Sequence, residues 1–324
     1  MYNALVGPAI PVSIPSGLGL VHTGPLMGGD PVPILKILSW LDHTLHMQLW
    51  LGDYLVSSVN LKNETGRSPL SWAAKHGHES IVKLLLEAQA EVNSKDCRSY
   101  MPLLRAIYEE HEAAVNLLLG AGTNANLKDV KGQTPLLLAA EYGNGAAVKL
   151  LIKAKFDLNS RGKDYCYTPL LFATENQHKG VVEILIDASA YVNLKDNLYG
   201  RTPLSCAARH RHKAVIKLLL AAQIETNPND KHDQTPLSLA AEDGHDAVAE
   251  LLLKTQIDIN SKNAYSQTPL SLASEYGKEG VVKLLLKARA DVKSRDRNGC
   301  TPLMLTAKNE HEGVVDLLQS FSSG

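Results

Sequence analysis

The chain has 324 residues, 44% hydrophobic and 21% charged, within the ordinary range for a globular protein with a sizeable buried core. Its 33 basic and 34 acidic residues leave a net charge of −1, which argues against a bulk electrostatic grip on nucleic acid or an anionic membrane. All apolar runs are far shorter than the roughly 20 residues of a membrane-spanning helix. Four scattered cysteines without a Cys-x-x-Cys pair argue against a structural zinc site and indicate reduced thiols, as in the cytoplasm or nucleus.

Residues 1–33 are rich in proline and glycine and show neither a helical nor an alternating hydrophobic period. We expect a disordered tail there, although a mistranslated exon boundary would give a similar composition. The first basic residue is Lys36, so the N-terminus lacks the positively charged residues with which a secretory signal begins.

Residues 34–59 align with the segment that lies 33 residues further on, so that Val59 falls on Val92. They contain bulky residues such as Trp40 and Trp50 in place of the Thr-Pro-Leu sequence of the later units. We expect a degenerate N-terminal capping repeat, because an end unit has no neighbour on one side. The alternative is the end of an upstream domain.

A proline recurs every 33 or 34 residues, and a leucine always follows it. Six of the eight prolines follow a threonine, and the other two follow Ser68 and Met101. Such a period predicts an array of small stacked units that form one elongated domain over residues 60–324. The prolines are Pro69, Pro102, Pro135, Pro169, Pro203, Pro236, Pro269 and Pro302.

The third unit shows the expected internal structure. Thr134 can cap a short helix, and Pro135 fits its first turn, where the missing N–H costs nothing. Gly143 can adopt the left-handed conformation that ends this helix. A second helix follows, with apolar residues from Val148 to Ile152, and then a polar connection. Each unit is therefore predicted to form a helix, a turn, a second helix and a hairpin-like finger.

The pattern Gly-x-Thr-Pro-Leu, Ala-Ala, Gly-His, Val-Val-x-Leu-Leu-Leu and Val-Asn closely resembles the ankyrin repeat, as residues 234–245 and 281–286 show. The resemblance covers eight units from residue 60 to about residue 320, with 34–59 as a ninth. It implies an all-α repeat solenoid of stacked helix-turn-helix units with β-hairpin-like fingers and a concave groove. The usual role of the family is to bind other proteins.

Two positions depart from the family pattern. The histidine that usually follows Thr-Pro-Leu is replaced, so a hydrogen bond between repeats should be absent or made by serine. The glycine that usually follows the second helix is present only as Gly122, so the other residues there should either cost about 1 kcal/mol each at positive φ or form another turn. The first position holds Ser71, Leu104, Leu137, Leu171, Ser205, Ser238, Ser271 and Met304, and the second holds Gln89, Lys155, Ser189, Gln223, Gln256 and Arg289.

No catalytic or metal site emerges from the histidines and acid pairs. Six histidines start the second helix of their units, one per unit, and are therefore too far apart for one ion. Acid pairs such as Glu109-Glu110 lie beside no nucleophile motif, and the usual phosphate-loop, serine-hydrolase and zinc-protease motifs do not occur. We expect no enzyme activity, no cofactor and no metal. The histidines are His78, His111, His178, His212, His245 and His311.

Asparagines and lysines also recur on the fingers. We expect the asparagines to bond their own backbone in tight turns, with hydroxylation, known in some family members, as the functional alternative. The lysines could form a basic stripe for RNA or phosphoinositide, but adjacent aspartates should cancel its field and leave a solvated edge. The residues are Asn60, Asn93, Asn126, Asn159, Asn193, Asn227 and Asn260; Lys62, Lys95, Lys128, Lys195, Lys262 and Arg295; and Asp96, Asp129, Asp196 and Asp296.

Tyrosine gives the sharpest functional signal. The family binds partners through its finger tips and the inward side of each first helix, and tyrosine and arginine are favoured interface anchors. Eight of the eleven tyrosines fall in this set, and the alternative is tyrosine merely tolerated on a solvated face. On the helices we expect partner binding by Lys75, His76, Tyr108, Glu109, Glu141, Tyr142, Arg209, His210, Glu242, Asp243, Glu275 and Tyr276. On the fingers we expect it by Arg98, Tyr100, Lys131, Tyr165, Tyr167, Tyr199, Arg201, Tyr265 and Arg297.

We therefore interpret the chain as a non-catalytic, monomeric scaffold or adaptor that binds a protein partner in its concave groove. Nucleic acid and membranes are not expected partners. Two alternatives stay open: a sensor segment of a larger multidomain effector, and an inhibitor that blocks a partner enzyme.

Overall fold

The computed structural model describes residues 59–322 except 125–126, 164 and 223. The expected tail at 1–33 lies outside the described residues, and so does the expected capping repeat at 34–59 apart from Val59, which is buried.

Eight helix pairs make up the described part of the chain. The first helices are α3 (Pro69–Lys75), α5 (Pro102–Tyr108), α7 (Pro135–Glu141), α9 (Pro169–Glu175), α11 (Pro203–Arg209), α13 (Pro236–Asp243), α15 (Pro269–Glu275) and α17 (Pro302–Lys308). The second helices are α4 (Glu79–Glu87), α6 (Glu112–Gly120), α8 (Gly145–Lys153), α10 (Lys179–Asp187), α12 (Lys213–Ala221), α14 (Asp246–Leu252), α16 (Glu279–Lys287) and α18 (Glu312–Ser322). None of the described residues forms a β-strand, and no helix among them is long and apolar enough to cross a membrane.

Every first helix begins at its repeated proline, as expected. In seven of the eight units the preceding serine or threonine accepts a hydrogen bond from the N–H three residues later, for example Leu137 N to Thr134 Oγ1 at 3.3 Å. Met101 has no side-chain oxygen and makes no such cap. The cap and the proline together fix where each first helix starts.

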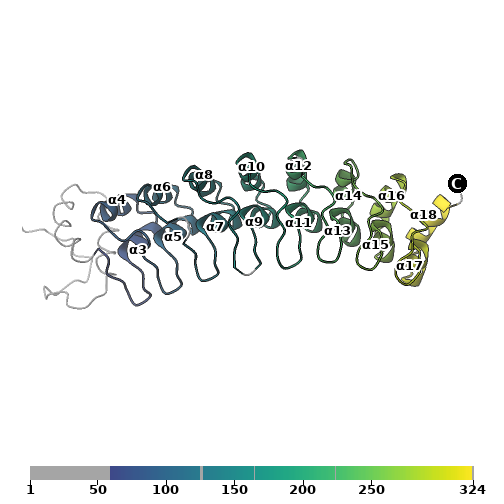
Figure 1. Ribbon diagram of the computed structural model, residues 1–324, viewed down its shortest axis with the longest axis horizontal. Coiled ribbons are helices and arrows are strands. Elements are labelled where there is room, and N and C mark those ends of the chain that lie inside the picture. The colour runs from purple at the N-terminus through teal and green to yellow at the C-terminus, as the bar shows by residue number, and fades with distance from the viewer. Residues whose placement is uncertain (1–58, 125–126, 164, 223, 323–324) are drawn as a thin grey trace, which may run out of the picture.

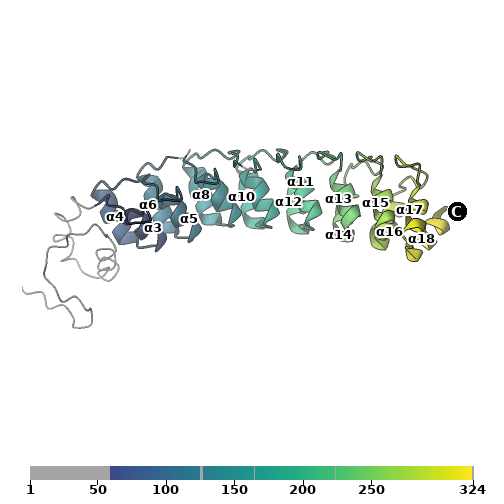
Figure 2. The ribbon, with the colours of Figure 1, turned by 90° about the horizontal axis from the view of Figure 1, so that it is seen from below.

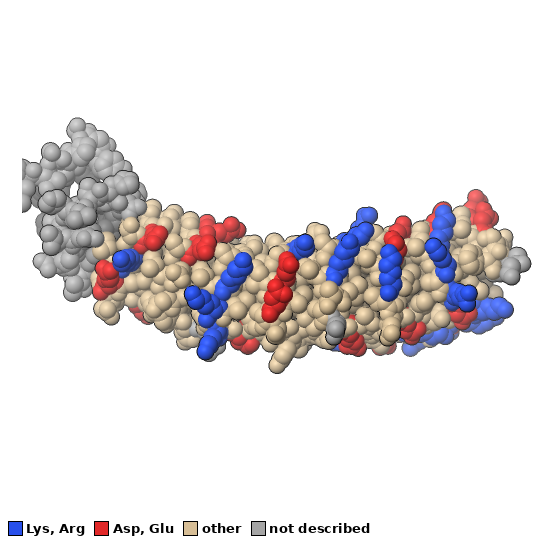
Figure 3. Space-filling view, turned by 90° about the horizontal axis from the view of Figure 1, so that it is seen from above, with Lys and Arg blue, Asp and Glu red and all other residues tan. Residues whose placement is uncertain are grey.

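The repeats stack into an elongated array in which the first helices, the second helices and the fingers form three rows (Figures 1 and 2). Each first helix contacts its own second helix and the first helix of the next repeat. Figure 3 views the outward side of the second helices, where bands of basic and acidic side chains alternate along the row.

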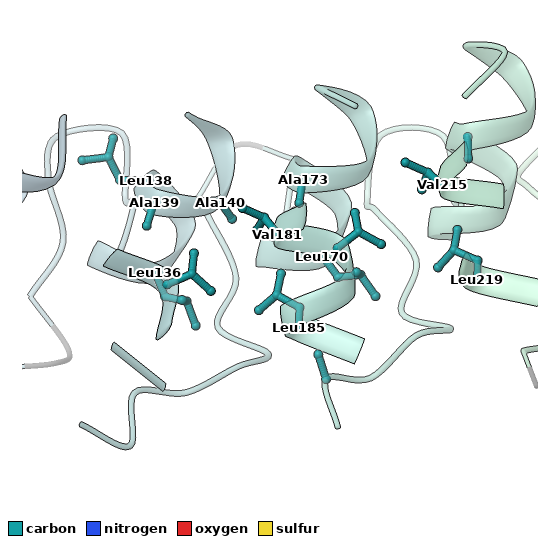
Figure 4. Close-up of a cluster of buried hydrophobic side chains, with 14 of the residues drawn as sticks. Leu136, Leu138, Ala139, Ala140, Leu170, Ala173, Val181, Leu185, Val215 and Leu219 are labelled. Atoms are coloured by element: carbon teal, nitrogen blue, oxygen red, sulfur yellow. The ribbon is translucent and has the colours of Figure 1, made fainter. Parts of the chain in front are cut away.

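One apolar core runs through the whole array. Leu136 and Leu170 point inward from successive first helices and meet Leu185 of a second helix (Figure 4). Ala139 and Ala140 are fully buried, and their small side chains let adjacent first helices approach closely. Full burial of one leucine stabilises a fold by about 1.5–3 kcal/mol. Stacking buries these leucines between repeats and so supplies stability that a single helix pair lacks. The expected all-α repeat solenoid is confirmed.

In six of the eight fingers the turn is built around a buried aspartate or asparagine. Asp129 Oδ1 accepts hydrogen bonds from Lys131 N at 2.9 Å and Gln133 N at 2.8 Å, and Asp129 N bonds to Gln133 O. Adjacent fingers are joined by backbone bonds such as Lys231 N to Tyr199 O at 2.8 Å. The aspartates beside the lysines are therefore buried in the finger turns, a role that the sequence did not indicate, whereas the lysines themselves are exposed, as expected of a solvated edge. Those turn carboxylates belong to Asp96, Asp129, Asp196, Asp230 and Asp296.

The finger lysines hold neighbouring repeats together. Their ammonium groups donate to backbone carbonyls of the adjacent finger, as Lys62 Nζ does to Lys95 O at 3.1 Å and Lys195 Nζ to Asn229 O at 2.6 Å. Because these contacts hold the lysine ammonium groups against the adjacent finger, the lysines do not form a free basic stripe.

The asparagine side chains form hydrogen bonds to the next repeat and not, as expected, to their own backbone. Together these bonds form a ladder along the array. Asn60 Oδ1 accepts from Glu91 N at 2.7 Å, and Asn260 Oδ1 accepts from Asp291 N at 2.9 Å. Asn93, Asn159, Asn193 and Asn227 make the same bond to the next repeat, whereas Asn126 lies outside the described residues. The structural role is confirmed, but its partner is the neighbouring repeat.

The histidines before the second helices also link repeats. The Nε2 atoms of His111, His178, His212, His245 and His311 lie 2.9–3.0 Å from a backbone carbonyl of the preceding repeat. In the third repeat the Nδ2 of Asn144 takes this place and donates to Ile107 O at 3.1 Å. No group of described residues could hold a metal ion.

Serine after Thr-Pro-Leu does not bond between repeats. Ser205, Ser238 and Ser271 place their hydroxyls 3.1–3.2 Å from the capping threonine of their own repeat. A hydrogen bond between repeats is therefore absent at these serines, which is one of the two expected outcomes, and histidines and asparagines make the links between repeats.

Several turns hold residues other than glycine at positive φ. After the second helices, the expected strain is present at Gln89, Lys155, Ser189 and Arg289, with φ of 61–65°. Gln256 is not among the positive-φ residues, and its turn follows the shorter helix α14; Gln223 lies outside the described residues. Between the two helices of a repeat, glycine adopts positive φ at Gly77, Gly143, Gly244 and Gly277, but Glu110, Gln177, Arg211 and Glu310 do so at 59–61°.

Candidate partner-binding face

The inner face comprises the fingers and the sixth and seventh residues after each repeated proline, which lie at the C-terminal end of each first helix. The finger turns and the proline-started helices bring these positions to one side of every repeat, because both elements are fixed within the repeat. All 21 predicted partner-binding residues are exposed or half-buried, and none is part of the core.

An aromatic cluster crosses the second and third repeats. The rings of Tyr108, at the end of α5, and Tyr142, the C-cap of α7, meet edge to face with centroids 4.9 Å apart, while 44% and 42% of their surfaces stay exposed. The Arg105 guanidinium lies 4.5 Å from the Tyr100 ring centroid and forms an ion pair with buried Asp96. Burial raises the pKa of Tyr100 and of Tyr142 above the ordinary value of 10, at which a tyrosine hydroxyl is already protonated at neutral pH and can donate hydrogen bonds.

A second aromatic group lies in the first repeat, around a tryptophan that the sequence reasoning missed. The Trp72 ring lies 4.4 Å from His76 and 5.4 Å from His78, centroid to centroid. Burial, and then the charges of Lys75 and His78, lower the pKa of His76. The spacing of four residues between Trp72 and His76 on one helix face was the available signal.

The fourth and fifth repeats carry tyrosines that are held by neighbours. Tyr167 packs against Phe172 with centroids 5.1 Å apart, and its burial together with a hydrogen bond to Glu175 raises its pKa. The guanidinium of Arg201 lies 4.3 Å from the Tyr199 ring centroid, and its Nε is 3.7 Å from Oδ2 of buried Asp230. Phe172 was not predicted as part of this face.

Three carboxylates of the inner face are oriented by glutamines eight residues earlier. Gln234 Nε2 donates to Glu242 Oε2 at 2.6 Å, and equivalent bonds join Gln133 to Glu141 and Gln267 to Glu275. The sequence reasoning missed the glutamines, although each directly precedes a Thr-Pro pair. These bonds reduce the side-chain entropy that a partner would have to remove.

The sixth and seventh repeats carry an acidic surface around Tyr276. Arg209 Nη1 lies 3.8 Å from Glu242 and 3.7 Å from Asp243, so one cation faces two carboxylates. Burial, and then the charges of Glu242, Glu275 and Asp243, raise the pKa of Tyr276, which is 49% exposed.

Tyr165 joins the aromatic group of the fourth repeat, since its ring centroid lies 5.9 Å from that of Tyr167, and the remaining predicted residues are exposed. Glu109 and His210 are exposed at C-cap positions, and His210 stacks on His212 with centroids 5.8 Å apart. On the fingers, Arg98, Lys131 and Arg297 are exposed and make no ion pair in the part of the chain that the structure describes. Tyr165 and Tyr265 are 50% and 61% exposed.

Comparison with protein families agrees with the repeat geometry. A model of three ankyrin repeats matches residues 103–196, 190–263 and 256–323, and a model of a single ankyrin repeat matches residues 65–97. The chain belongs to the ankyrin repeat family. The resemblance seen in the sequence is thereby confirmed, and ankyrin repeats are generally protein–protein interaction modules. A search among curated proteins gave no match to this ankyrin repeat chain.

Proposed function

We propose that this ankyrin repeat protein is a non-catalytic scaffold or adaptor that binds a protein partner along its inner face. The observation that carries the proposal is the Tyr108–Tyr142 pair. These two rings fix each other across a repeat boundary, yet each keeps more than two fifths of its surface exposed. Rigid, amphipathic area of this kind is typical of interface anchors.

Preorganisation supports the same proposal. Arg105 and Arg201 each lie over a tyrosine ring beside a buried aspartate, and the glutamines hold three glutamates in place. A partner that binds these groups loses less conformational entropy than one that binds free side chains. The polar side chains therefore supply orientation, and the exposed rings supply contact area.

The charge along the inner face favours a partner of mixed charge. Lys75 and Arg209 occupy the same helix position as Glu141, Glu242 and Glu275 in other repeats. A partner segment that follows the array would need an acidic group near the first repeat and basic groups near the third and seventh, while Arg209 of the fifth repeat already faces the carboxylates of the sixth. We place this interaction in the cytoplasm or nucleus, with a monomeric array, in keeping with the four free cysteines.

Affinity capture from a lysate, with the intact chain as bait, tests the proposal. The chain is compared with the triple variant Y108A, Y142A and Y276A, and with Y191A as a matched control, since Tyr191 is 64% exposed but is not one of the predicted partner-binding residues. We expect a partner retained by the chain and by Y191A and lost by the triple variant, whose folding is checked by circular dichroism.

Cross-linking then maps the contact. Cross-links to the inner face support the proposal, and a partner held equally by all three proteins overturns it. Adding the chain to a captured enzyme distinguishes an inhibitor, which lowers the enzyme's rate, from an adaptor, which leaves it unchanged. A captured effector domain that functions only when fused to the array would favour the sensor alternative.

A further inference from the structure

A basic hollow lies on the outward side of the second-helix row and is separate from the inner face. It has a volume of about 540 Å³ and opens between α10 and α12. Four cationic side chains line it, namely Lys179, Arg211, Lys213 and Lys217, and no carboxylate does. In Figure 3 this region shows as a basic band over α12.

The four cations face no carboxylate among the residues that line the hollow. None of them forms an ion pair within the described residues. The pKa of Glu250 on α14 is lowered by its hydrogen bond to Lys254 and, less strongly, by the charge of Lys213. The Glu250 carboxylate is therefore already paired with Lys254, with Nζ and Oε1 2.7 Å apart. Glu183 and Asp187 lie further along α10, outside the lining. Four like charges around one hollow repel each other, so a bound anion would lower the electrostatic free energy.

A hollow two repeats away shows that this charge is not a general property of the row. It lies between α14 and α16, has a volume of about 430 Å³ and contains Asp246 and Glu250 together with Lys283 and Lys287. Its two carboxylates balance its two ammonium groups. The two hollows therefore share their place in the fold but differ by four units of charge.

Backbone strain coincides with the basic hollow. Gln177 and Arg211 both line it, and both occupy the turn between two helices at φ of 59° and 61°. Four other repeats place glycine at this turn, where the same φ costs little. A residue with a Cβ pays about 1 kcal/mol there, so Arg211 brings its guanidinium to the hollow at a cost in stability.

We propose that this hollow binds an acidic segment of a protein partner, rich in aspartate or glutamate. The charge of the lining selects an anion. The open shape and the spread of the cations over α10, α12 and the turn before α12 fit an extended chain with several carboxylates better than a single small anion. The site is separate from the inner face and does not depend on the partner proposed there.

Fluorescence anisotropy with a labelled hexaglutamate peptide and the full chain tests the proposal. The double variant K213Q and K217Q is compared with K283Q and K287Q, which removes the same charge from the neutral hollow. We expect the first variant to bind at least about tenfold more weakly and the second to bind within about twofold of the unaltered chain. Equal weakening by both variants, or no binding by the unaltered chain, overturns the proposal.

Competitors separate the sources of anionic charge. Inorganic phosphate, single-stranded oligonucleotide and vesicles containing an anionic lipid are each added at matched charge concentration. Displacement of hexaglutamate only by a second acidic peptide supports the proposal. Stronger displacement by phosphate, oligonucleotide or vesicles overturns it in favour of that ligand class.

The strained turn gives an independent test. R211G should raise the free energy of unfolding, because glycine accepts positive φ, and should weaken hexaglutamate binding at least threefold. E110G relieves the same strain at a distant turn and should stabilise the fold without changing binding by more than about twofold. Equal binding by R211G and the unaltered chain would contradict a role for Arg211.

Discussion

The side of each repeat that faces its neighbour differs in kind from the side that forms the inner face. Towards the neighbour, the same groups recur: asparagine accepting a backbone N–H, histidine against a carbonyl, leucine in the core. On the inner face, one helix position holds lysine, tyrosine, glutamate and arginine in different repeats. The residue types that recur from repeat to repeat are thus those that stacking requires. Positions that vary between repeats are not constrained by stacking and can serve binding.

Removal of a core leucine should have the largest effect on stability. Leu170 is 1% exposed, and Leu170→Ala should lower the free energy of unfolding by about 3 kcal/mol, since it leaves a cavity between two repeats. Urea unfolding followed by circular dichroism measures this loss. Tyr142→Ala, on the inner face, serves as the comparison and should lower stability by only about 1 kcal/mol, through the loss of its ring contact with Tyr108. Equal losses in both variants would contradict the division between the two sides.

Two histidines only two residues apart sharpen the comparison. His212 Nε2 lies 3.0 Å from Glu175 O of the preceding repeat, whereas His210 is an exposed C-cap residue of the inner face. His212→Ala should cost about 1 kcal/mol, because it leaves a carbonyl between repeats without its partner, and His210→Ala should cost much less. Chemical denaturation of both variants tests this, and a larger cost for His210→Ala would reverse the assignment.

The smallest expected effect is a pH dependence that arises on the inner face. Burial lowers the pKa of His76 and of His210 below the ordinary 6.5, so the unfolded chain binds more protons there near pH 6. This contribution to stability is present above pH 6.5 and is lost as the pH falls through the two lowered pKa values. Both rings are largely exposed, so the loss should be only a few tenths of a kcal/mol.

Unfolding at pH 7.5 and 5.5 measures this slope. The double variant H76Q and H210Q should show a smaller loss of stability on acidification than the unaltered chain. A steeper loss in the double variant would show that the two rings are not the source.

Features that depend on local sequence could be predicted, and features that depend on the neighbouring repeat could not. Thr134 and Pro135 specify a helix start within four residues, so the sequence located it correctly. The partner of Asn60 is a backbone N–H at residue 91, and no local rule connects the two. Stacking also decides that Asp129 is buried, since a short polar finger by itself would leave it in water.

The inner face shows the same limit. Tyrosines at helix ends were correctly expected to be accessible, because the core positions were already filled by leucine, valine and alanine. The pairing of Gln234 with Glu242 depends on the angle between finger and helix, which spacing alone does not reveal. Trp72 lies one helical turn before His76, outside the two positions per helix that the family pattern assigns to binding, so the pattern did not include it.

The asparagine ladder gives the array a direction. Each rung runs from a side chain in one repeat to the backbone of the next, so a repeat with asparagine at this position can receive any successor of matching length. A 33-residue unit duplicated between Asn193 and Asn260 would find a rung on both sides. A unit fused after the eighth repeat would meet Lys293, which has no acceptor oxygen to offer. A unit inserted within the array would therefore keep this ladder intact, and Lys293→Asn would supply the missing rung for a unit added after the eighth repeat.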